Sequence, residues 1–96
     1  MSRWLLERRL SQTTERLASL RSELAQVEEQ YAVVADEAAD QELRALVSET
    51  PMAGHEAAGA RRQASVMARH RDHLRSSIDE LERRQDEILD SLGAVR

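Results

Sequence analysis

The strongest constraint in this sequence is an apolar repeat that alternates steps of three and four residues along two long segments. The first segment carries the repeat at Leu6, Leu10, Thr13, Leu17, Leu20, Leu24, Val27, Tyr31, Val34 and Ala38. The second carries it at Ala57, Ala60, Ala64, Met67, Arg71, Leu74, Ile78, Leu81, Gln85, Ile88, Leu92 and Val95. A heptad pattern of this kind is typical of helices that pack together as a coiled coil.

One short stretch, Ser48-Glu49-Thr50-Pro51, separates the two repeats. Threonine is a favoured helix N-cap and proline is favoured at the first helical position, so Thr50 and Pro51 indicate the start of a helix. Proline also disfavours a helical conformation in the residue before it. The sequence therefore predicts a single domain over residues 1–96, with helices at about 2–48 and 51–94 and a turn at about 48–51.

A turn this short makes the two helices fold back on each other in opposite directions. A turn near residue 49 pairs positions whose numbers add to about 98, which sets leucine against leucine or isoleucine and Thr13 against Gln85. Arg71 falls opposite Val27 in the seam, where a lone charge commonly fixes the register or the oligomeric state. The predicted fold class is therefore all-α, a two-helix antiparallel coiled-coil hairpin.

The repeat weakens after Tyr31, which leaves two alternatives open. Leu43, Leu46 and Val47 lie off the earlier stripe, and residues 36–40 are acidic and rich in alanine. The first helix either continues through this segment or breaks near residues 35–40. A break would give three helices, at about 2–34, 36–48 and 51–94.

Composition removes most other classes of protein. The 96 residues include two aromatic residues, three glycines, one proline and no cysteine, which argues against sheet-rich folds and excludes disulfides and thiolate metal sites. The net charge is −4, so attraction to nucleic acid or to an anionic membrane surface is not expected. Because no segment is apolar enough to cross a membrane and the first residues do not resemble a signal peptide, we expect a cytoplasmic location.

Several large apolar residues lie outside the predicted seam. Near the turn these are Leu43, Leu46, Val47 and Met52, and at the other end of the hairpin they are Trp4, Leu5 and Leu89. Apolar residues in such positions usually bury against another surface. Two hairpins could pair as a homodimer in a four-helix bundle, or a different protein could cover these residues. We therefore expect a protein-interaction, regulatory or scaffold module that works through the patches at the tip and the open end.

The sequence carries no constellation typical of an enzyme, a metal site or a cofactor site. His70 and His73 can share part of a helix face, but neither has the glutamate three positions earlier that a di-metal site in a helix bundle uses. Gly54 and Gly59 fit no phosphate-binding loop. We predict no enzyme activity, no catalytic residues, no bound metal and no cofactor.

The most basic stretch of the chain is residues 61–75. Arg62, Arg69 and Arg83 share one outward stripe of the second helix, which could contact phosphates or an acidic partner. The hairpin lays residues 61–75 beside acidic residues of 23–37, which offset this positive charge. The alternative function is therefore an accessory factor of a nucleic-acid machine, in transcription or translation, that uses the arginine stripe or the acidic tip.

Overall fold

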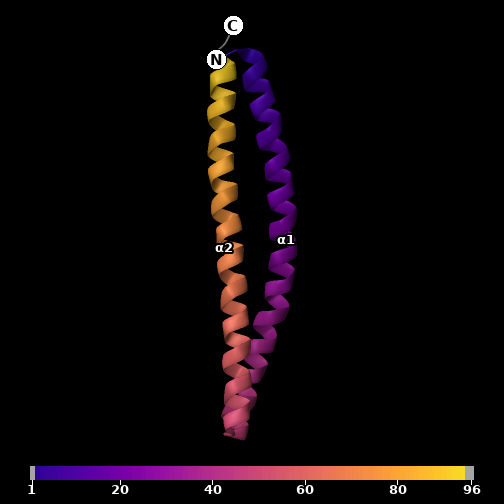
Figure 1. Ribbon diagram of the computed structural model, residues 1–96, viewed down its shortest axis with the longest axis vertical. Coiled ribbons are helices and arrows are strands. Elements are labelled where there is room, and N and C mark those ends of the chain that lie inside the picture. Colours follow the sequence, from indigo (N-terminus) through magenta and orange to yellow (C-terminus); the bar gives the residue numbers. More distant parts are fainter. Residues whose placement is uncertain (1, 95–96) are drawn as a thin grey trace. The chain divides into compact units, whose positions relative to one another are not determined.

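The computed structural model describes residues 2–94, and within that range it contains two helices and no strand. Helix α1 spans Arg3–Ser48 and helix α2 spans Pro51–Ala94. The two helices run in opposite directions from a two-residue turn (Figure 1). The predicted all-α antiparallel hairpin is confirmed. Pairing of two hairpins into a four-helix bundle stays a prediction, and Val95 of the predicted repeat lies outside the described residues.

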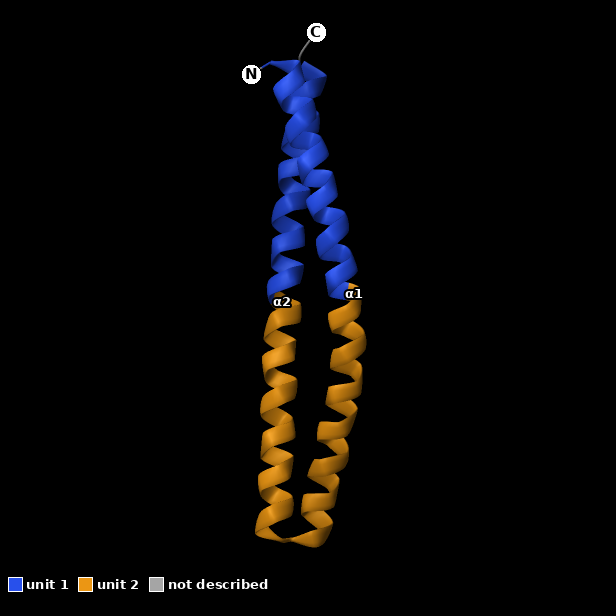
Figure 2. Ribbon diagram, turned by 45° about the vertical axis from the view of Figure 1, so that its right-hand side comes forward, with its two compact units in different colours: residues 1–24, 73–96 blue, residues 25–72 orange. Residues whose placement is uncertain are grey.

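The chain divides into two compact units, coloured separately in Figure 2. Unit 1 comprises residues 1–24 and 73–96, and unit 2 comprises residues 25–72 with the turn. Each unit contains a segment of α1 and an antiparallel segment of α2. By sequence, unit 2 holds nine acidic residues against five arginines, a net charge of −4, and unit 1 holds nine of each. The whole negative excess of the chain therefore belongs to unit 2.

Different local interactions in the turn end α1 and start α2. Glu49 adopts a left-handed backbone conformation, with φ of 54°, and its N–H donates to the carbonyl of Ala45 at 3.0 Å. The Oγ1 of Thr50 accepts a hydrogen bond from the N–H of Ala53 at 3.2 Å. Thr50 is thus the N-cap of α2, as predicted, and it leaves Pro51 as the first helical residue, where a missing N–H costs nothing.

Helix α1 runs without interruption through residues 35–40, so the predicted alternative of a break there is wrong. The seam continues at the same spacing through smaller or polar side chains: Ala38 is buried, and Gln41 and Ala45 are half-buried. A coiled-coil seam needs residues that fit between the helices, and alanine meets that need as well as favouring helix. The large residues Leu43 and Leu46 are therefore not required to fill it.

In unit 1 the core is built from large aliphatic side chains of both helices. The buried residues are Leu6, Leu17, Leu20, Leu74 and Ile78. Beside them, the Nε2 of Gln85 donates to the Oγ1 of Thr14 at 3.1 Å. The sequence predicts that Gln85 lies opposite Thr13. In the structure, Gln85 forms its hydrogen bond with Thr14, the next residue along α1.

In unit 2 the core is much smaller. Its buried residues are Val27, Ala38 and Ala57, with Tyr31 and Met67 half-buried. An alanine side chain contributes little apolar area, so the layers of this unit that contain Ala38 and Ala57 gain less from burial than a leucine layer does.

Two inter-helix ion pairs, one in each unit, occupy equivalent positions beside the seam. Arg21 Nη2 lies 3.1 Å from Glu82 Oε1 in unit 1, and Arg61 Nε lies 2.7 Å from Glu42 Oε1 in unit 2. Each of these four residues follows a buried seam residue by four positions. In each unit, the ion pair therefore joins α1 and α2 through positions that flank the seam, one helical turn after a buried residue.

Candidate functional site

Four large apolar side chains, which we name the tip patch, are exposed on both sides of the turn. Leu43, Leu46 and Val47 belong to the last turns of α1, and Met52 belongs to the first turn of α2; they are 62%, 76%, 79% and 72% exposed. Residues three and four apart on a helix are neighbours, so the three from α1 form one continuous surface. Ala45 is half-buried and takes the seam position among them, which leaves the tip patch facing outward.

Carboxylates border the tip patch. Asp36 and Asp40 are exposed, lie one helical turn apart, and lead along the outward face of α1 into Leu43. Glu49 is exposed in the turn. Within residues 2–94 no cationic side chain pairs with Asp36, Asp40 or Glu49. We name these three residues the acidic rim.

Two other acidic residues of the same segment are already engaged. Glu42 forms the ion pair with Arg61, and the Oε1 of Glu37 accepts a hydrogen bond from the Nε2 of Gln41 at 3.4 Å. The Oε1 of Gln41 is buried and accepts no hydrogen bond among the described residues. The side-chain amide of Gln41 therefore donates a hydrogen bond but accepts none among the described residues.

A second exposed apolar group lies in unit 1 and comprises Trp4, Leu5 and Leu89, which we name the open-end patch. These side chains are 63%, 43% and 49% exposed. The guanidinium of Arg8 lies 5.6 Å from the centre of the Trp4 ring. One face of the indole is thus covered by a cation from its own helix, and the open-end patch offers less free apolar surface than the tip patch.

The arginine stripe predicted from the sequence is exposed at all three positions. Arg62 and Arg69 lie in unit 2, and Arg83 lies in unit 1. Among the described residues, no carboxylate forms an ion pair with any of the three. They are available to an anionic partner, although unit 2 as a whole is acidic.

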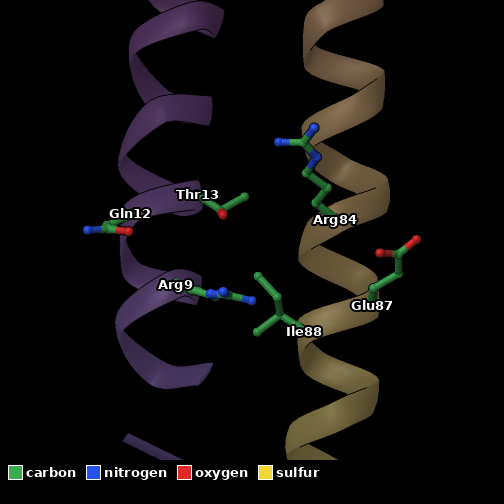
Figure 3. A pocket seen from close by; sticks show the side chains of 6 residues that line it. All are labelled: Arg9, Gln12, Thr13, Arg84, Glu87 and Ile88. Atoms are coloured by element: carbon green, nitrogen blue, oxygen red, sulfur yellow. The ribbon is translucent and has the colours of Figure 1, made fainter. Parts of the chain in front are cut away.

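A groove of about 400 Å³ lies in unit 1 beside Thr13, and the sequence did not predict it. Arg9 and Arg84 both extend into the space between the helices there, and Ile88 points toward Arg9 from the opposite helix (Figure 3). Arg84 is held by Glu80, with 3.0 Å between Nη2 and Oε1. The signal in the sequence was Thr13, because a seam position without a large aliphatic side chain leaves space between two helices.

Among residues 2–94, no three histidine, aspartate or glutamate side chains converge where they could hold a metal ion. Within residues 2–94, neither helix has a stretch apolar enough to span a lipid bilayer.

Comparison of the chain with models of protein families, with curated proteins and with solved structures gave no match.

Proposed function

We propose that this protein is a non-enzymatic coiled-coil module that binds another protein, or a second copy of itself, through the tip patch. The observation that carries the proposal is the exposure of Leu43, Leu46, Val47 and Met52, each 62% or more. A helix that only had to complete the hairpin would need polar residues at these positions. The open-end patch is a second contact surface in this proposal.

The energetics of burial favour this use of the tip patch. Fully covering one large aliphatic side chain contributes about 1.5–3 kcal/mol. Association costs at least about 4 kcal/mol in lost translational and rotational freedom. Burial of three or four of these side chains in a partner groove would offset at least the lower end of that cost. The partner is then a protein surface with a matching apolar groove or helix face.

A photo-crosslinking residue at Leu46, introduced into the full chain in its native cells, tests the proposal. The matched control carries the same residue at Ser76, which is exposed on α2. We expect a discrete adduct, either with one other protein or with a second copy, from position 46 and not from position 76. The adduct should disappear when Leu43→Gln and Val47→Gln are added. Equal labelling from positions 46 and 76 would overturn the proposal.

A role beside nucleic acid is the second candidate, because Arg62 and Arg69 are exposed and lack an ion-pair partner among the described residues. Phosphate contacts make binding fall steeply with salt. In this case the protein should bind a labelled duplex or single strand at low salt, and Arg62→Gln with Arg69→Gln should weaken that binding and flatten its salt dependence. Absence of binding at low salt would remove this candidate.

A further inference from the structure

The segment that carries the tip patch also holds most of the unbalanced charge of the chain. Residues 36–56 contain six acidic residues and one arginine, Arg44, whereas the net charge of the whole chain is −4. Glu42 is neutralised by Arg61. The acidic rim of Asp36, Asp40 and Glu49 has no cationic partner within residues 2–94. An apolar surface and a negative field thus coincide on one outward face.

The arrangement along α1 is linear. Asp36 and Asp40 come before the apolar residues on the same face, and Glu49 comes after them in the turn. Glu49 follows Asp36 by thirteen positions, a span of about 20 Å along a helix. A partner helix of three to four turns has this length. It would place apolar residues against the tip patch and cations near both ends of it.

Building on the proposed function, we infer that the tip patch binds a basic amphipathic helix, with apolar residues on one face and lysine or arginine flanking them. Charge complementarity selects this occupant over a second copy, because two tip patches in contact would bring two acidic rims together. Juxtaposed like charges cost free energy, and Arg44, the one arginine of residues 36–56, cannot neutralise two rims. A cationic helix satisfies both the apolar surface and the carboxylates.

Three labelled helical peptides of equal length test the inference on the full-length protein. One carries leucine on one face and lysine elsewhere, one replaces every lysine by glutamate, and one keeps the lysine–leucine composition but scatters the leucines around the helix. Fluorescence anisotropy at low and high salt reports binding. We expect the amphipathic lysine peptide to bind at least about tenfold more tightly than the other two at low salt, and to weaken as salt rises.

Two charge variants locate the effect. Asp36→Asn with Asp40→Asn removes two carboxylates from the acidic rim. Asp86→Asn with Asp90→Asn removes the same charge from exposed positions of unit 1. We expect the first pair to weaken binding of the lysine peptide several-fold and the second pair to leave it nearly unchanged. Equal weakening by both pairs would overturn the inference, because it would show attraction to the net charge and not to the rim.

The variant Leu43→Gln with Leu46→Gln separates this inference from the proposed function. If the lysine and glutamate peptides bind equally well and both lose binding in this variant, the apolar docking surface holds and the basic partner is wrong. If the binding of no peptide depends on Leu43 and Leu46, and crosslinking at position 46 also fails, both this inference and the proposed function are wrong. A stable dimer by light scattering that this variant dissociates would assign the tip patch to a second copy. Helicity measured by circular dichroism must match the wild type in every variant compared.

Discussion

The guanidinium of Arg71 lies 4.7 Å from the centre of the Tyr31 ring, so a cation of α2 covers the one tyrosine of the chain, which α1 carries. The same guanidinium contacts its neighbour Asp72, with 3.0 Å between Nη2 and Oδ1. Arg71 was predicted as a lone charge in the seam. Its place in the structure gives the charge two partners and leaves the side chain only partly exposed.

We predict that the contributions of Tyr31 and Arg71 to stability are coupled. Tyr31→Leu should lower the midpoint of urea unfolding more in the wild type than in an Arg71→Met background, because methionine keeps an apolar stem but offers the ring no cation. Circular dichroism of the four proteins in a double-mutant cycle measures this coupling. Strict additivity of the two substitutions would contradict it.

The contribution of Arg71 to stability should not change with pH across the neutral range. The hydrogen bond with Asp72 raises the pKa of Arg71 above its ordinary value. A group whose pKa is raised by folding adds stability that is fully present below the unfolded pKa and is lost only as the pH rises through the folded pKa. Loss of the Arg71 contribution is therefore confined to strongly alkaline solution.

Leu17 and Leu43 should respond very differently to the same substitution. Leu17 is fully buried, so Leu17→Ala should cost about 3 kcal/mol of unfolding free energy through lost burial and a residual cavity. Leu43 is 62% exposed, and Leu43→Ala should stay within about 0.5 kcal/mol. Chemical denaturation of dilute protein measures both. Similar large losses would mean that Leu43 is covered in solution, as self-association through the tip patch would require.

The N-cap at the turn offers a third test. Thr50→Ala removes the acceptor of the Ala53 N–H and should lower the unfolding free energy by about 1 kcal/mol. Thr50→Ser retains a hydroxyl oxygen and should recover most of that loss. If serine behaved like alanine, the effect would come from the threonine methyl group and not from the cap.

Gln41 provides a site where a substitution should stabilise the fold. Its buried Oε1 accepts no hydrogen bond within the described residues, and an unpaired buried acceptor costs free energy. Gln41→Leu should raise the unfolding free energy by about 1 kcal/mol. The control is Gln26→Leu at an exposed position of the same helix, where a change within about 0.5 kcal/mol is expected. A loss of stability in Gln41→Leu would contradict the argument.

The sequence was sufficient to predict the hairpin, since the start of α2 at Pro51 and the cap at Thr50 follow from local chemistry that acts within a few residues. At residues 35–40 the sequence left a continuous helix and a break as alternatives, because no large apolar residue continues the repeat beyond Ala38. Gln41 and Ala45 keep the same spacing, but glutamine is polar and alanine is small, so an apolar repeat does not identify them as seam residues.

The surfaces were only partly predictable. The exposed tip residues could be named because a heptad fixes which positions face outward. The entry of both Arg9 and Arg84 into one groove, and the choice of Glu42 as the partner of Arg61, depend on side-chain conformations across two helices. Spacing along one helix does not determine those conformations.

The unequal cores of the two units have a consequence for motion. Unit 1 buries four leucines and one isoleucine among its described residues, whereas unit 2 buries one valine and two alanines. Local opening is easiest where little apolar surface holds the backbone, so amide hydrogens of unit 2 should exchange with solvent sooner than those of unit 1. The surface proposed for binding thus belongs to the less protected half of the chain, and a partner that covers it would slow that exchange as it binds.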